Sequence, residues 1–140
     1  MKLQLTRRMV LAGAVALTAV PAFGQDAWPT APVRVFVGFP AGSSPDTLAR
    51  IITDQLAQRL GQPVVIENRP GAGGVIGVQQ MLVSAGDGHT FGTTINGPLT
   101  TSQRMMDSTG YDVEADIAPV TLIATSPLVL AVSASSDIGD

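Results

Sequence analysis

Residues 33–60 read Val-Arg-Val-Phe-Val-Gly-Phe-Pro-Ala-Gly-Ser-Ser-Pro-Asp-Thr-Leu-Ala-Arg-Ile-Ile-Thr-Asp-Gln-Leu-Ala-Gln-Arg-Leu. The first part, 33–39, is rich in β-branched and aromatic residues, which predicts a strand buried on both faces. Apolar residues then recur every three to four positions over 48–60, which predicts an amphipathic helix. A short turn over 39–46 joins the two and completes a strand–turn–helix unit.

The turn over 39–46 carries small, uncharged residues up to Asp46. Ser44 is a suitable N-cap, and Pro45 suits the first helical position, where its missing N–H is not needed. Open α/β sheets bind ligands beyond the carboxyl ends of their strands, and the N–H groups of a helix start favour an anion there. We interpret the turn as a binding site for a carboxylate or a phosphate. An ordinary strand–helix connection is the alternative, and Asp46 either receives a ligand amine or hydroxyl or faces solvent.

Residues 1–24 have the pattern of an export signal. A basic start precedes an apolar run over 9–20, which is shorter than the roughly 20 residues that span a bilayer. Small residues then allow cleavage near Gly24, so we predict export to the periplasm. The pair Arg7-Arg8 also resembles a twin-arginine signal, and both export routes stay open.

Composition narrows the function classes. Removal of the first 24 residues would leave 116 of the 140, with five of the eight basic residues and all eleven acidic ones, so the formal charge would change from −3 to −6. Such a chain has no basic surface for nucleic acid or anionic lipid, and we expect no membrane insertion after signal cleavage. With no cysteine, it has no disulfide, thiolate metal site or lipid-anchored cysteine.

Strand and helix patterns alternate along the rest of the chain. Further strands are expected at 64–68, 90–95, 117–123 and 128–132, and helices at 75–84 and 99–106. This alternation predicts right-handed βαβ units and a largely parallel sheet flanked by helices, an α/β fold. The polar run 133–140 follows a predicted strand without a helix to cover it, so we expect the sequence to be the first part of a longer chain, with a tapering natural end as the alternative.

The glycine-rich segment 71–77 departs from two nucleotide-binding motifs. Ile76 stands where the dinucleotide fingerprint needs glycine, and no acidic residue closes a strand about 20 residues later. No Gly-Lys-Ser/Thr follows, as a P-loop would require. We therefore predict a compact turn whose glycines adopt positive φ and let the next helix pack closely.

No catalytic or metal-binding constellation emerges from the sequence. His89 has no cysteine, second histidine or nucleophile elbow to work with, so we expect a surface or strand-edge residue, with a general base as the alternative. Asp107, Asp112, Glu114 and Asp116 lack the spacing of a calcium loop and predict a solvated acidic face. We predict no catalytic residue, metal or cofactor.

Asn96 and Gly97 end the predicted strand at 90–95, at the same sheet edge as the first turn if the sheet is parallel. Small polar groups there would complete a ligand cleft with neutral hydrogen bonds, whereas an ordinary strand-ending turn is the alternative. The predicted ligand-binding residues are Phe39, Pro40, Ala41, Gly42, Ser43, Ser44, Asp46, Asn96 and Gly97.

Several motifs together resemble the extracytoplasmic solute-binding receptors of the tripartite tricarboxylate transporter group, the Bug family. They are Phe39-Pro40-x-Gly42 with Asp46, Gly61-Gln62-Pro63-Val64-Val65, Glu67-Asn68-Arg69-Pro70-Gly71-Ala72-Gly73-Gly74, Ile76-Gly77, Asp87-Gly88-x-Thr90, Tyr111-Asp112 and Ala118-Pro119-Val120-Thr121-Leu122. The resemblance implies a two-domain periplasmic binding protein fold of type II, in a chain about twice this length. Residues 25–98 would then belong to the first domain, and 99–140 to the crossover and the start of the second.

The resemblance also implies a function. A monomeric receptor would capture a small carboxylate in its interdomain cleft, partly through water, and deliver it to the subunits of a membrane transporter. Ser43 stands where similar turns carry a second glycine, Pro45 removes one N–H donor, and Thr101-Ser102-Gln103 departs from an Asn-Pro pattern. The ligand's identity therefore does not carry over. The alternatives are an α/β enzyme or nucleotide-binding domain, and a truncated fragment without function.

Overall fold

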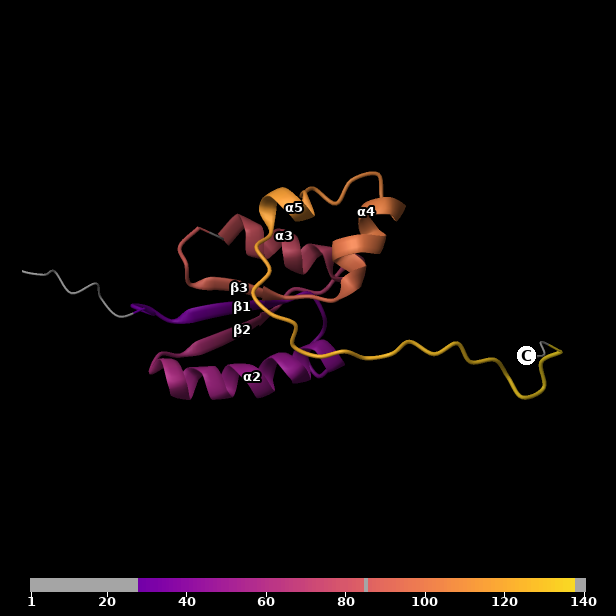
Figure 1. Ribbon diagram of the computed structural model, residues 1–140, viewed down its shortest axis with the longest axis horizontal. Helices are drawn as coiled ribbons and strands as arrows, with labels where there is room; N and C mark the ends of the chain where they lie inside the picture. Colours follow the sequence, from indigo (N-terminus) through magenta and orange to yellow (C-terminus); the bar gives the residue numbers. More distant parts are fainter. Residues whose placement is uncertain (1–27, 85, 138–140) are drawn as a thin grey trace, which may run out of the picture.

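A computed structural model describes residues 28–84 and 86–137 (Figure 1). The predicted export signal and its cleavage site lie outside these residues. The elements in chain order are β1 (Val33–Val37), α2 (Ser44–Leu60), β2 (Val64–Asn68), the 3-10 turn η1 (Ala72–Gly74), α3 (Val75–Ser84), β3 (Thr90–Thr93), the π-helical segment η2 (Gly97–Thr101), α4 (Ser102–Met105) and α5 (Val113–Asp116). Among the described helices, none has the length and apolar character needed to cross a membrane.

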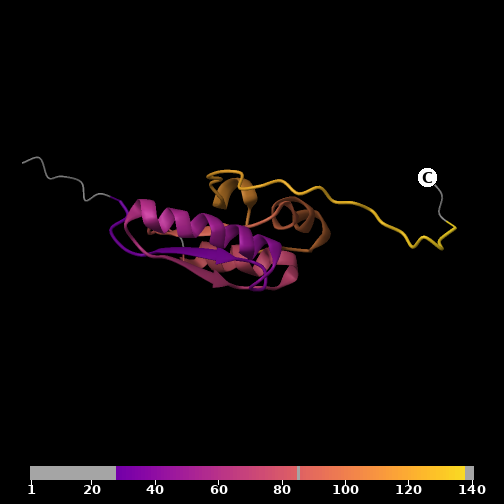
Figure 2. The ribbon, with the colours of Figure 1, turned by 90° about the horizontal axis from the view of Figure 1, so that it is seen from below.

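The three strands form a parallel sheet in the order β2-β1-β3. Val33 pairs with Val64 on one side of β1, and Arg34 pairs with Thr90 on the other. Helix α2 packs mainly on β2, whereas α3 packs on β1 and β3 from the opposite face (Figure 1). Seen from below, α2 runs along the strands (Figure 2). The predicted α/β fold, a parallel sheet flanked by helices, is confirmed.

Strand β1 is the centre of the core. Val33, Val35, Phe36 and Val37 are all buried, and Val37 is 0% exposed. Because β1 has a strand on each side and a helix on each face, its apolar side chains are shielded from solvent, which confirms the prediction of a doubly buried strand, although the Arg34 side chain is 42% exposed. A second cluster lies on α3, where buried valines pack against the ring of Tyr111.

The apolar positions predicted to bury helix α2 are only partly buried. Ile51 is 60% exposed, and Leu48 and Leu56 are each 39% exposed. The small side chains of Ala49 and Thr53 face the sheet instead, with Thr53 donating its hydroxyl hydrogen to the carbonyl of Arg50 at 3.2 Å. The predicted apolar face of the helix was wrong at these positions. Small residues let the helix lie close to a narrow sheet, and the larger side chains then lie beyond the edge of the sheet.

The strands predicted at 117–123 and 128–132 are absent from the described structure. These residues form an extended, exposed segment that leaves the sheet, and Leu130 is 96% exposed (Figure 1). A strand requires a neighbour that satisfies its N–H and C=O groups, and none of the described strands lies beside this segment. The apolar, β-branched composition was therefore insufficient to predict a strand.

Local ends also differ from the predictions. Strand β3 stops at Thr93 rather than 95, and the helix expected at 99–106 begins earlier, as η2 followed by α4. Helix α5 was not predicted. It begins after Asp112, whose carboxylate accepts the N–H groups of Glu114 and Ala115, so a helix cap formed where the sequence suggested only an acidic loop.

Glycines bring α3 close to the central strand. Gly71, Gly73 and Gly74 have φ of 144°, 64° and 104°, which confirms the predicted positive-φ turn. A Cβ on Gly77 would overlap the Cα of Gly38 and lie 2.7 Å from its nitrogen. Backbone meets backbone at this crossing, so no flexible side chain can move aside.

Substitution Gly77→Ala should therefore destabilise the protein by about 1–3 kcal/mol, as overpacking does. In an open helix the same change would stabilise by about 0.5–1 kcal/mol. The measurement is urea unfolding followed by circular dichroism. Gly97→Ala is the matched control, because a Cβ there would meet only the Ile95 side chain, at 3.9 Å. Equal stability of both variants would contradict the close crossing.

Candidate functional site

Three chain connections meet at the carboxyl edge of the sheet. The turn after β1 contains Phe39, the turn after β2 contains Gly74, and Pro98 follows β3. A Cβ on Gly74 would lie 2.9 Å from Cζ of Phe39 and 3.0 Å from Cγ of Pro98, so the three turns are in contact. The N–H of Arg69 donates to the carbonyl of Val37 at 2.8 Å and joins the ends of β1 and β2. This is the edge at which open α/β sheets bind ligands.

The turn between β1 and α2 begins its helix one residue earlier than predicted. Ser43, with φ −70° and ψ 163°, is the N-cap residue, so Ser44 is the first helical residue and Pro45 the second. The predicted N-cap at Ser44 was therefore wrong. The Ser43 hydroxyl does not cap the helix but donates to the carbonyl of Pro40 at 2.6 Å. The hydroxyl thus closes the turn on itself.

Some amides of this region already have acceptors within the protein. Ser43 N–H donates to the carbonyl of Pro40 at 3.2 Å, and Thr47 N–H donates to the carbonyl of Ser43 at 2.9 Å, which is the first bond of the helix. Helix geometry leaves the N–H groups before Thr47 without an intrahelical acceptor, and Pro45 has none to offer. The exposed residue Ser44 therefore presents a main-chain donor at the positive end of the helix dipole.

Asp46 lies inside the turn rather than on its surface. Its side chain is 1% exposed, so the solvent-facing alternative was wrong. One carboxylate oxygen, Oδ2, accepts the Gly42 N–H at 2.8 Å and the Arg50 Nε–H at 2.9 Å. The other, Oδ1, accepts from Arg50 Nη2 at 3.0 Å and from Asn68 Nδ2 at 2.8 Å. Protein donors thus occupy both oxygens.

These contacts shift the acidity of the group. The Arg50 guanidinium, then the Asn68 amide and the Gly42 N–H, hold the pKa of the Asp46 carboxyl well below its ordinary value, because each stabilises the ionised form. Asp46 in turn raises the pKa of Arg50. The pair is therefore an ion pair throughout the physiological range.

Arg50 and Asn68 were not among the predicted site residues. The spacing of Asp46 and Arg50, four residues apart on a helix, is a signal that sequence reasoning had available. Asn68 closes the group by accepting from Arg50 Nη2 at 3.2 Å and donating to the carbonyl of Phe39 at 3.0 Å. Its position depends on how β2 aligns with β1, and no local pattern reports that register.

The other predicted site residues lie at the same sheet edge. Asn96 is exposed and precedes η2, where its carbonyl accepts the Thr100 hydroxyl at 2.7 Å. Gly97 opens η2, next to the buried Pro98 that touches Gly74. The predicted meeting of the two turns at one edge is thus confirmed, while their contact with a ligand stays a prediction.

His89 lies immediately before β3, half-buried, as its predicted strand-edge place requires. Its Nε2 accepts the Thr30 N–H at 3.1 Å, and Nδ1 lies 2.8 Å from the carbonyl of Asp87. Since a carbonyl can only accept, Nδ1 carries the hydrogen. The Trp28 ring lies beside the imidazole, with 6.1 Å between centroids. The histidine thus fastens the segment before β1 to the sheet.

All four carboxylates at 107–116 are exposed, and two of them serve local structure. Asp112 caps α5, and Asp116 Oδ2 accepts the Asp112 N–H at 2.8 Å. Within 28–84 and 86–137, the structure holds no group of three or more histidine, cysteine or acidic residues placed to share a metal ion.

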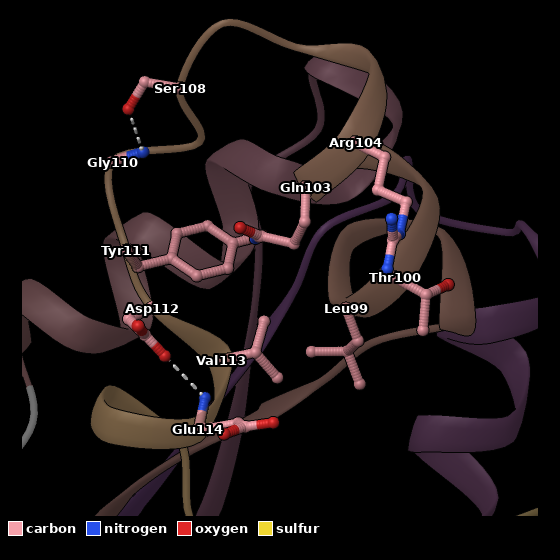
Figure 3. A pocket seen from close by; sticks show the side chains of 10 residues that line it. All are labelled: Leu99, Thr100, Gln103, Arg104, Ser108, Gly110, Tyr111, Asp112, Val113 and Glu114. Carbon is pink, nitrogen blue, oxygen red and sulfur yellow. Dashed lines mark hydrogen bonds between the residues drawn. The ribbon is translucent and has the colours of Figure 1, made fainter.

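A surface hollow of about 670 Å³ lies between α4 and the segment that leads into α5 (Figure 3). It contains none of the predicted ligand-binding residues. Tyr111 forms its floor, with the hydroxyl donating to the carbonyl of Pro98 at 2.9 Å, and burial raises the pKa of this hydroxyl. The buried Thr109 hydroxyl lies within hydrogen-bond distance of Gln103 Oε1, at 3.0 Å, and of the Tyr111 carbonyl, at 3.2 Å. No sequence pattern predicted this hollow, because its walls come together only through folding.

A family model described as tripartite tricarboxylate transporter family receptor matches residues 48–140. A UPF0065 protein of Bordetella bronchiseptica is 37% identical over 134 residues, covering 96% of this chain and 40% of that protein. The protein BugT of Bordetella pertussis is 39% identical over 131 residues, covering 91% of this chain and 40% of BugT. The chain thus spans about 40% of the length of these relatives.

A solved structure described as that of a periplasmic transporter has a similar fold. It is 37% identical and superposes with a TM-score of 0.57, over 62% of this chain and 29% of that one. The match agrees with the predicted periplasmic binding protein-like fold.

The ion pair of Asp46 should make stability depend on acid. Because its folded-state pKa lies below the unfolded value of about 3.9, its stabilising effect is present above pH 4 and is lost as the pH falls further. We expect Asp46→Asn to unfold at a lower temperature than the wild type at pH 7. Its melting temperature should also fall less than that of the wild type between pH 7 and pH 2.5. Thermal unfolding by circular dichroism measures both.

Asp107→Asn, which changes an exposed carboxylate, is the control and should keep the wild-type acid dependence. The hydrogen bond from Arg34 also lowers the pKa of Glu67. Asp46→Asn should therefore retain some of the acid sensitivity of the wild type. Parallel pH curves for the wild type and Asp46→Asn would contradict the role assigned to Asp46.

Proposed function

We propose that this chain, which belongs to the tripartite tricarboxylate transporter receptor family, is part of a periplasmic receptor for a small carboxylate. The receptor holds its ligand in the cleft between two domains and delivers it to a membrane transporter. The observation that carries the proposal is the turn at 39–46, which places an exposed helix start at the carboxyl edge of the sheet and has its one acid neutralised.

The chemistry of the turn suits a carboxylate. Main-chain N–H groups and the helix dipole attract negative charge, and no cationic side chain of the turn competes for it. A bound water can bridge a carboxylate to an amide at a cost of only about 0–2 kcal/mol, so direct contact with every donor is not needed. Asn96 and Gly97, at the same sheet edge, would supply neutral hydrogen-bonding groups.

The arrangement of the chain supports a two-domain receptor. In our proposal, residues 25–98 belong to the first domain and 99–140 to the crossover and the start of the second. After α5 the extended segment 117–137 leaves the three-stranded sheet instead of adding to it (Figure 1). Closure of two such domains would bury the ligand and present a surface that a transporter recognises.

The complete protein should be stabilised by carboxylates. Tight binding of acetate, succinate or citrate at a hundredfold excess over Kd adds about 2.7 kcal/mol to the free energy of unfolding, which raises the melting temperature. Thermal-shift measurements with these three acids provide the test. Succinamide, which has the shape of succinate without its charge, is the control ligand and should give no shift. Turnover of any acid, or no shift from all three, would contradict the proposal.

Substitutions at Ser44 separate main-chain from side-chain binding. Ser44→Pro removes the N–H donor from the first helical position, where proline is tolerated, and Ser43 already has the extended conformation that precedes a proline. We expect it to weaken carboxylate binding by about tenfold or more, the value of one charged hydrogen bond. Ser44→Ala keeps the amide and should bind like the wild type. Isothermal titration of the complete protein measures both, and the opposite ranking would show that the hydroxyl binds.

A further inference from the structure

The carboxylate of Asp46, the guanidinium of Arg50 and the amide of Asn68 form a closed triangle. Each member contacts the other two, over distances of 2.8–3.2 Å. The triangle has two further bonds to the turn, one from the Gly42 N–H to Asp46 and one from Asn68 to the Phe39 carbonyl. It therefore connects the end of β2 and the start of α2 to the beginning and the middle of the turn at 39–46.

The charge of Asp46 makes Arg50 necessary. A lone carboxylate buried beside the turn would repel an anionic ligand, and at an effective dielectric constant of about 20 two unit charges interact strongly over several ångströms. Arg50 contacts both carboxylate oxygens with Nε and Nη2, in the fork geometry that fixes orientation as well as charge. The pair brings no net charge to the turn.

Asn68 contributes orientation. Its amide nitrogen donates to both Asp46 and the Phe39 carbonyl, while its oxygen accepts from Arg50. An aspartate at this position would have no donor and would place a second negative charge against Asp46. The side chain at the end of β2 must therefore be an amide for this triangle to close.

We propose that Arg50 and Asn68 are positioning residues of the carboxylate site. They neutralise and orient Asp46, which fixes the Gly42 amide and so sets the direction in which the free amides of the turn face the ligand. This inference rests on the proposed function. It assigns roles to two residues that do not contact the ligand themselves and act on it through Asp46 and the turn.

The test measures the affinity of the complete protein for whichever of acetate, succinate and citrate binds it best. Arg50→Met should lower the affinity about tenfold, because Asp46 then keeps an uncompensated charge. Asp46→Asn in the Arg50→Met background removes that charge and should restore the affinity to within about threefold of the wild type. Arg59→Met removes the same charge from the exposed last turn of α2 and is the matched control, expected to bind normally.

Salt dependence separates an electrostatic role from a merely structural one. Raising the ionic strength from 0.01 M to 1 M shortens the Debye length from about 30 Å to 3 Å and screens the charge of Asp46. The difference in carboxylate affinity between Arg50→Met and the wild type should therefore shrink. Loss of packing alone would leave the deficit unchanged and would make the double variant the weakest binder. Either of those results overturns the proposal.

Two further variants keep the test decisive if Arg50→Met fails to fold. Arg50→Lys keeps the charge without the fork and should lose less affinity than Asn68→Asp, which adds a charge. Equal affinity of Asn68→Asp and the wild type overturns the inference while leaving the receptor function intact. Absence of binding by the wild type to all three acids overturns the proposed function, and this inference with it.

Discussion

The buried carboxylate of Asp46 is the constraint around which the strand–turn–helix unit is organised. An ionised carboxylate only accepts hydrogen bonds and offers two oxygens, and here four N–H donors from Gly42, Arg50 and Asn68 fill them. Gly42 has φ of 82°, a conformation that glycine adopts without strain, and the bond to Asp46 holds it there. The direction of the turn thus follows from one side chain and the donors that surround it.

The same edge of the sheet is tightly packed at two glycines. Gly74 has no room for a Cβ between Phe39 and Pro98, and Gly77 meets Gly38 directly. Three connections can approach each other only because these residues are small. In the site that we propose, amides and carbonyls of these connections would face the ligand, so its selectivity would depend on backbone geometry and would be sensitive to changes that shift the turns without touching the ligand.

Sequence patterns predicted the features of the fold that neighbouring residues determine. The 33–60 unit has a strand and a helix because periodicity and the residues of its turn agree, and Gly61 ends the helix with φ of 66°, as its position after Leu60 indicates. The burial of Asp46 and the role of Asn68 depend on the β1–β2 register, which brings residues 22 positions apart into contact. The segments 117–123 and 128–132 have the composition of strands, but a strand also requires a partner, and composition does not report one.

While Arg50 is present, a neutral residue would not serve in place of Asp46. Asparagine has a single side-chain oxygen, and its amide hydrogens would face the donors of Arg50 and Asn68. Holding four donors requires the charge, and at the anion-binding edge that we propose this charge requires a cation that does not itself face the ligand. Arg50, one helical turn further along α2, meets both conditions, since its guanidinium reaches Asp46 while its own main chain lies beyond the turn. The acid and the base are therefore one structural unit, and each is destabilising without the other.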